Sequence, residues 1–113
     1  MAVSIQIYAW LVLAILLEVC GTMMLPLTQN FTRLVPTAVL VLCYTVAFYL
    51  LTFVLRALPL SVVYATWSGL GIFSIAVLGY LFFGQALAWQ VVLGLFFIIL
   101  GVVLVNWFPA PPV

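Results

Sequence analysis

The sequence predicts an all-α integral membrane protein, built as a bundle of four transmembrane helices. Hydrophobic residues make up 71% of the 113-residue chain, and the mean hydropathy is +1.58. Charged residues make up only 3%, which is too few to cover an apolar core with a polar surface, as a soluble domain must. The apolar residues form four runs of about 20 residues, the length of helix that crosses a hydrocarbon layer of about 30 Å.

The ends of the four runs are marked by proline, glycine and polar residues. Pro26 follows the first run, Pro59 precedes the third and Gly84 follows it. A proline inside a run removes a backbone donor that lipid cannot replace. The predicted helices, which together form one domain over residues 1–113, span about residues 4–25, 36–55, 60–83 and 87–107. The proline-rich tail, residues 109–113, cannot continue a helix, and we expect it to be disordered.

Few residues carry charge or reactive chemistry. Glu18, Arg33 and Arg56 are the only charged side chains, so a basic surface for nucleic acid and an acidic site for metal ions are both excluded. The chain has no histidine, which excludes a histidine-based catalytic triad. Cys20 and Cys43 lie inside apolar runs, where we expect them to pack as small hydrophobic side chains rather than form a disulfide or metal site. Neither an enzyme nor a cofactor is expected.

The two arginines leave the orientation in the membrane undecided. Arg33 lies after the first predicted helix and Arg56 after the second, so they emerge on opposite faces and balance each other under the positive-inside rule. Such a chain can insert both ways and pair with an inverted copy of itself. Alternatively, a partner subunit sets its orientation.

Glu18 is the residue most indicative of function. An ionised carboxylate deep in a membrane costs about 2.5–3.5 kcal/mol on insertion scales. The chain has no lysine, and both arginines lie at predicted helix ends, so no cationic side chain is expected at the depth of Glu18. We therefore expect Glu18 to face a cavity filled by water or ligand, and to be the neutral acid much of the time. The alternative is a neutral acid that serves only to pack two helices.

Residues three, four and seven positions from Glu18 share its face of the first predicted helix. Small residues on this face leave room for a ligand or for a closely packed second helix. On or beside this stripe lie Tyr8, Leu11, Ala14, Ile15, Gly21 and Thr22.

The third predicted helix places two aromatic residues on one face, followed by small ones. These residues are Tyr64, Trp67, Ser68 and Gly71. An aromatic stripe by itself more often packs in a core. Together with a membrane-embedded carboxylate, however, tryptophan and tyrosine faces suit a desolvated organic cation. Tyr44 and Phe48, from the second helix, can complete such a wall.

Pairs of glycines mark two further features. Gly69 and Gly71 interrupt the third helix and indicate a hinge, although glycine is also common in membrane helices that do not bend. Gly94 and Gly101 lie seven residues apart on one face of the fourth helix, where they permit another helix to approach closely. We interpret that face as an association surface, because the fourth helix has no polar side chain between Gln90 and Asn106.

Several short segments, in their order and spacing, match a known family across essentially the whole chain. They are LEVCGT at 17–22, FTRL at 31–34, YATWSGLG at 64–71, FFGQ at 82–85 and the stretch from Gly94 to Gly101. In these segments the chain resembles the small multidrug resistance transporters, and in particular their quaternary-ammonium-exporting branch.

The resemblance implies a proton-coupled antiporter that exports lipophilic cations across a bacterial inner membrane, with no cofactor besides the proton gradient. Glu18 is then the group that binds protons and substrate alternately, and Tyr64 and Trp67 wall the site. The remaining lining residues implied are Tyr8, Leu11, Ala14, Ile15, Gly21, Thr22, Tyr44, Phe48 and Ser68. The family functions as an antiparallel homodimer or as a pair of related subunits, and the Gly94 to Gly101 face resembles its dimer-forming segment.

The chain departs from the family pattern in its loops, which have lost charge. Pro26 stands where a lysine is expected, Gln29 where an acidic residue is common, and Ala86 and Ala88 where the third loop usually carries charges. A natural member with weakly biased insertion and a chain deliberately reduced in charge both fit this pattern.

Two other functions stay open. The guanidinium-exporting branch needs a tighter polar site with bidentate hydrogen bonds to a planar cation, and Tyr64 and Trp67 beside Gly21 and Thr22 argue against it. A non-transporting scaffold or assembly subunit would use Glu18 only to pair helices.

Overall fold

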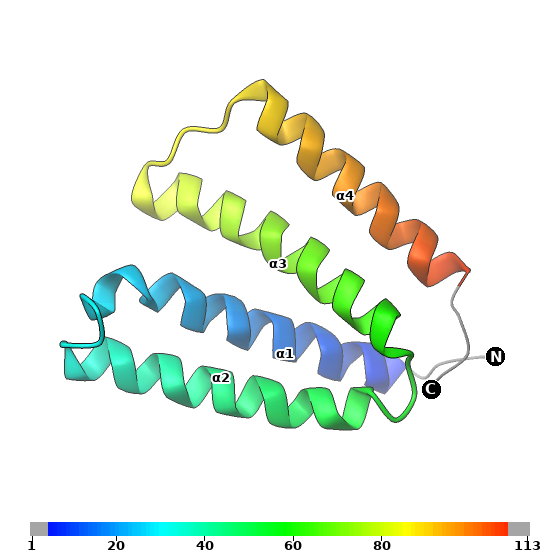
Figure 1. Ribbon diagram of the computed structural model, residues 1–113, viewed down its shortest axis with the longest axis horizontal. Coiled ribbons are helices and arrows are strands. Elements are labelled where there is room, and N and C mark those ends of the chain that lie inside the picture. Colours follow the sequence, from blue (N-terminus) through cyan, green and yellow to red (C-terminus); the bar gives the residue numbers. More distant parts are fainter. Residues whose placement is uncertain (1–4, 109–113) are drawn as a thin grey trace. The chain divides into compact units, whose positions relative to one another are not determined.

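Four long α-helices account for most of the chain in the computed structural model, which describes residues 5–108 (Figure 1). The helices are α1 (Ile5–Met24), α2 (Leu34–Val54), α3 (Leu60–Phe83) and α4 (Trp89–Trp107). Each is long and apolar enough to cross a membrane, and residues 5–108 contain no strand. The predicted all-α, four-transmembrane-helix fold class is confirmed. The predicted disordered tail and the expected first helical residue, Ser4, lie outside the described residues.

The helices form two compact pairs along the chain. One unit, Met1–Ala57, contains α1 and α2, and the other, Leu58–Val113, contains α3 and α4. Each pair is described by itself below. The single four-helix domain expected from the sequence stays a prediction.

In the first pair, α1 and α2 lie side by side and run in opposite directions (Figure 1). A short 3-10 helix, Pro26–Thr28, leads into a turn in which residues 29–31 all have left-handed backbone angles, with φ between 48° and 65°. The buried Thr28 hydroxyl donates to the Leu25 carbonyl at 2.8 Å and accepts from the Phe31 amide at 3.2 Å. Side-chain hydrogen bonds of this kind replace the backbone bonds that a tight turn loses.

Two helix starts differ from those expected. α2 begins at Leu34, two residues before Pro36. Proline is tolerated there because the amides of a first helical turn have no partner within the helix. α4 begins at Trp89, two residues later than expected, and its preceding residue, Ala88, is extended. The bounds of α3 are the expected ones.

In the second pair, α3 and α4 are joined through Gly84, which ends α3 in a left-handed conformation with φ of 67°. Glycine is favoured at such a C-terminal position because it has no Cβ to clash with the backbone. α3 is continuous from Leu60 to Phe83, through Gly69 and Gly71. The hinge predicted at these glycines therefore stays a prediction about a different conformation.

α4 contributes no buried residue to its pair. Around both Gly94 and Gly101, no side-chain or neighbouring-helix atom lies within 4 Å of the position that a Cβ would occupy. The face that contains these glycines is open within the α3–α4 pair. An open face of this kind allows another helix to pack closely against it.

Candidate functional site

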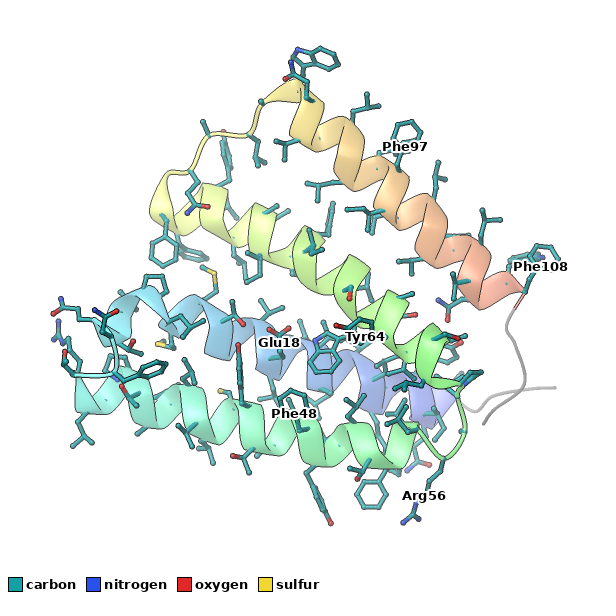
Figure 2. All side chains as sticks on the ribbon, in the orientation of Figure 1. Glu18, Phe48, Arg56, Tyr64, Phe97 and Phe108 are labelled. Carbon is teal, nitrogen blue, oxygen red and sulfur yellow. The ribbon has the colours of Figure 1, made fainter. Side chains whose placement is uncertain are left out.

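Glu18 lies within α1, the first transmembrane helix. At a rise of about 1.5 Å per residue, it is about 9 Å from the Met24 end of the helix and about 20 Å from the Ile5 end. Its side chain is half-buried. Figure 2 shows Glu18 well inside α1, whereas Arg56 lies beyond the end of α2. The one acidic group of the chain therefore sits at a depth at which the ionised form is penalised.

Two hydroxyl groups link Glu18 to the neighbouring helix. Thr22, one helical turn after Glu18, donates from its Oγ1 to the Glu18 Oε2 at 2.6 Å. The same Oγ1 lies 2.5 Å from the hydroxyl oxygen of Tyr44, on α2. A threonine hydroxyl has a single proton. When Thr22 uses that proton to hydrogen-bond to Glu18, the Tyr44 hydroxyl must be the donor to Thr22. The hydrogen bonds then run from Tyr44 to Thr22 and from Thr22 to Glu18.

Gly21 allows this chain of hydroxyls to form. A Cβ built at Gly21 would lie 2.6 Å from both Cδ1 and Cε1 of the Tyr44 ring, closer than carbon atoms approach without strain. The absence of a side chain on α1 therefore leaves the space that the Tyr44 ring occupies. This close approach brings the Tyr44 hydroxyl to Thr22.

The first pair brings together five of the predicted site residues. Glu18, Thr22, Tyr44 and Gly21 form the cluster just described. Phe48 adds an aromatic edge, since its ring centroid lies 6.1 Å from that of Tyr44 with the planes 84° apart. Such edge-to-face pairs are favourable between aromatic rings.

The remaining predicted site residues of α1 have little exposed surface with which to contact a ligand. Leu11, Ala14 and Ile15 are buried, with exposed fractions of 5% or less. Tyr8 is half-buried. Their proposed contact with substrate stays a prediction.

Three predicted residues, Tyr64, Trp67 and Ser68, belong to α3 in the second pair. The Tyr64 side chain is exposed, at 67%, and both Trp67 and Ser68 are half-buried. Their spacing places them on one side of α3, as the sequence predicts. A role for them as a wall opposite Glu18 stays a prediction.

A family model described as Small Multidrug Resistance protein matches residues 6–98. This chain belongs to the small multidrug resistance family. The match covers the carboxylate, the Tyr44 hydroxyl and the aromatic face of α3. With four membrane-spanning helices, this member of the family is a multi-pass protein of the bacterial inner membrane.

Curated members of the small multidrug resistance family are similar to the chain over nearly its whole length. Quaternary ammonium compound-resistance protein QacE of Escherichia coli is 44% identical over 100 residues, which cover 88% of this chain and 90% of that protein. Multidrug transporter EmrE of Escherichia coli K12 is 40% identical over 99 residues, or 88% and 90% of the two chains. Nicotine metabolites export pump subunit NepA of Paenarthrobacter nicotinovorans is 41% identical over 103 residues, or 91% and 89%.

One polar contact of this small multidrug resistance protein was not predicted from its sequence. The Asn106 side-chain amide, on α4, donates to the Thr66 hydroxyl on α3 at 2.8 Å, and to the Val102 carbonyl at 2.9 Å. Thr66 in turn donates to the Val62 carbonyl at 2.7 Å. Both polar side chains lie in apolar runs, which is the signal that could have identified an interhelical hydrogen bond.

Gly69 also has a role that the hinge hypothesis did not include. A Cβ at this position would overlap the side chain of Val102 on α4 and approach Ile98. Gly69 therefore lets α3 and α4 pack closely, about one turn away from the Thr66–Asn106 hydrogen bond. The second pair is held by a small residue and a polar contact, both typical of helix packing in membranes.

Proposed function

We propose that this chain is a proton-coupled antiporter that exports hydrophobic, aromatic and quaternary ammonium cations by exchange at Glu18. The observation that carries the proposal is the carboxylate inside α1, hydrogen-bonded by Thr22, which is itself bonded to Tyr44. Membership of the small multidrug resistance family, together with relatives named for multidrug and quaternary ammonium resistance, supports the substrate class.

Competition for one carboxylate explains the exchange. At the depth of Glu18 the ionised carboxylate is unfavourable, and either a bound proton or a bound organic cation neutralises its negative charge. The two cannot neutralise the same carboxylate at once, so each displaces the other. The exchange needs no cofactor, because the proton gradient supplies the free energy.

The shape of a quaternary ammonium ion determines what else the site must provide. Such an ion has no N–H donor, so it is recognised by charge and by the faces of aromatic rings. Tyr44 and Phe48 supply aromatic surface from α2, beside Glu18. In the proposal Tyr64 and Trp67 supply the rest from α3. A site built in this way accepts many cations, since it imposes little directional hydrogen bonding.

The hydrogen bonds among Tyr44, Thr22 and Glu18 can form with the carboxylate either ionised or protonated. When Glu18 is ionised, Tyr44 donates to Thr22 and Thr22 donates to Glu18. When Glu18 is protonated, its O–H donates to Thr22, and Thr22 then donates to Tyr44, since each hydroxyl both donates and accepts. The three groups thus stay hydrogen-bonded through the proton cycle without moving their heavy atoms.

Coupling requires one further property: the empty, deprotonated site must not change the side of the membrane that it faces. The cost of moving an ionised carboxylate through the apolar interior of the membrane supplies this restriction. The proposed assembly is a dimer, either an antiparallel homodimer or a pair of related subunits. The balance between Arg33 and Arg56 supports the antiparallel form, and the open Gly94 and Gly101 face of α4 supports close pairing.

Proton release on cation binding tests the proposal. Tetraphenylphosphonium is added to purified protein in weakly buffered detergent solution, and the pH change is followed. The wild type should release protons, and Glu18→Gln should release none while keeping its helical content. Glu18→Asp, which retains a shorter carboxylate, should still release protons and bind more weakly. Continued release by Glu18→Gln, or none by the wild type, would overturn the proposal, and the second result would favour a scaffold.

A further inference from the structure

An aromatic cluster lies at the last turn of α2, and the Arg56 guanidinium lies against it. The Phe53 ring is at the centre of the cluster. Its centroid lies 5.6 Å from that of Trp10, on α1, and 5.1 Å from that of Tyr49, one turn earlier on α2. Both contacts are edge-to-face, a geometry favoured between aromatic rings. The Arg56 Cζ lies 5.2 Å from the same Phe53 centroid. Arg56 therefore rests on an aromatic surface built from both helices.

The cluster lies near the ends of its two helices, where a membrane changes from hydrocarbon to head groups. Phe53 is one residue before the end of α2, and Arg56 follows that end by two residues. Trp10 is about 8 Å inside the Ile5 end of α1. Tryptophan and tyrosine are enriched in this layer, and long arginine side chains extend towards it. Figure 2 shows the Arg56 side chain directed away from α1 and α2. The guanidinium therefore reaches the layer in which lipid phosphates lie.

The charge of Arg56 has no carboxylate close to it. The single acidic side chain of the protein is that of Glu18, which lies about 12 Å further along α1 than Trp10 does. Within residues 5–108, the Phe53 ring is the one side-chain partner of the Arg56 guanidinium. An aromatic ring attracts the positive charge, but it does not take up the five N–H donors of a guanidinium. These donors are available to an anion.

An exposed apolar stripe continues from the cluster towards the middle of the membrane. Tyr49, Val46 and Leu42 follow Phe53 at intervals of three or four residues, so they share one face of α2. Their side chains are exposed, at 63%, 38% and 65%. From Phe53 to Leu42 the stripe is about 16 Å long, a length over which an acyl chain can lie. The anion that fits this end of α2 is therefore one that carries an acyl chain below its charge.

We propose that Arg56 and the aromatic cluster of Trp10, Tyr49 and Phe53 bind the head group of an anionic phospholipid. The guanidinium donates to two phosphate oxygens, in a planar fork that lysine lacks. The Phe53 ring holds the guanidinium in place before the lipid binds, which lowers the cost of ordering it. The acyl chain lies along the stripe below. This site does not depend on the proposed transport function.

The test measures lipid binding to the delipidated whole protein by native mass spectrometry from detergent micelles. The probes are dioleoyl phosphatidylglycerol, which is anionic, and dioleoyl phosphatidylcholine, which has the same acyl chains and no net charge. The wild type should bind phosphatidylglycerol more tightly. Arg56→Gln should bind the first phosphatidylglycerol about tenfold more weakly or worse, the factor expected for one hydrogen-bonded contact between charged groups. A 100-fold excess of inorganic phosphate over lipid should not displace the lipid, and displacement would overturn the choice of a lipid as the occupant.

Arg33 provides the matched control. It is exposed and precedes α2 at the opposite end of that helix, and within residues 5–108 its guanidinium contacts no aromatic ring. Arg33→Gln removes the same charge, so it should weaken binding by less than about fivefold, the effect of one charge near a membrane surface. Arg56→Lys keeps the charge and should fold, but it should also bind more weakly than the wild type because it lacks the planar fork. Equal losses in Arg33→Gln and Arg56→Gln, wild-type affinity in Arg56→Lys, or no preference for phosphatidylglycerol in the wild type would overturn the proposal.

A double-mutant cycle tests the part played by the ring. Phe53→Leu keeps an apolar side chain at the end of α2 but removes the aromatic face. It should weaken phosphatidylglycerol binding by about two- to fivefold in the wild type, the factor for a cation–π contact at an exposed site. In Arg56→Gln it should have no further effect, because no cation is left to hold. The same loss in both backgrounds would show that Phe53 does not position Arg56, and would overturn the assignment of the cluster to the site.

Discussion

Gly21→Ala tests whether the close approach of α1 and α2 depends on the missing side chain. The added Cβ would lie 2.6 Å from two carbons of the Tyr44 ring, whereas carbon atoms in contact are separated by about 3.5–4.0 Å. The ring must therefore move by about 1 Å. That movement strains or breaks the 2.5 Å contact between the Tyr44 and Thr22 hydroxyls.

The expected change in the free energy of unfolding combines two unfavourable contributions and one favourable contribution. Overpacking a close contact costs about 1–3 kcal/mol, and the loss of a neutral hydrogen bond about 0.5–1.5 kcal/mol. Alanine gains about 1 kcal/mol over glycine in helix propensity. We expect Gly21→Ala to destabilise the protein by about 1–3 kcal/mol, measured by titrating folded protein in mixed micelles with sodium dodecyl sulfate.

Making Gly21→Ala in a Tyr44→Ala variant separates the steric clash with the Tyr44 ring from the gain in helix propensity. Without the ring, Gly21→Ala should be neutral or stabilising, so the two substitutions should show a coupling free energy of at least about 1 kcal/mol in a double-mutant cycle. Additive effects of Gly21→Ala and Tyr44→Ala would refute the reasoning, because they would show that the ring does not occupy the space beside Gly21.

Three further predictions concern the hydroxyl chain, the second pair and the orientation. Thr22→Val should weaken tetraphenylphosphonium binding by about 10- to 150-fold, since a hydrogen bond to a charged group contributes about 1.5–3 kcal/mol. Thr45→Val, which removes a hydroxyl bonded to the backbone, should leave binding unchanged, and equal effects of the two substitutions would contradict the prediction. Asn106→Leu should lower the free energy of unfolding by about 0.6–1.7 kcal/mol in the same unfolding titration. Thr66→Val should destabilise the Asn106→Leu variant less than it destabilises the wild type. Additive effects of the two substitutions would mean that the two side chains do not interact. In a variant whose only cysteine is added after the last residue, that cysteine should be labelled from both sides of the membrane. Lysines added beside Arg56 should change the ratio of chains labelled from the two sides. A single orientation in the chain without added lysines would contradict the antiparallel homodimer.

Much of the fold could be predicted because it depends on composition along the chain. Four apolar runs of membrane-spanning length predict four helices, and this prediction does not depend on how the helices pack against one another. The helix starts were less predictable, as Pro36 shows. A proline in an apolar run suggests a boundary, but it is tolerated anywhere in a first turn, so α2 begins two residues earlier.

The candidate site could be predicted in part. Glu18 stands out because one carboxylate in an apolar helix is costly wherever it faces, and Thr22 follows it by one helical turn. That Thr22 also contacts Tyr44 needs the relative position of two helices.

The sequence by itself therefore determined the four spans, the depth of the single acid and the family, since these follow from residue types and their order. Only the tertiary structure decided the partners across each helix pair: Thr22 with Tyr44, and Thr66 with Asn106. The physical reason is that these helices are apolar on all sides. A helix in water has one apolar stripe that shows which side is buried, but a helix in lipid has no such stripe. Its rotation is set by small residues and hydrogen bonds at the contact itself.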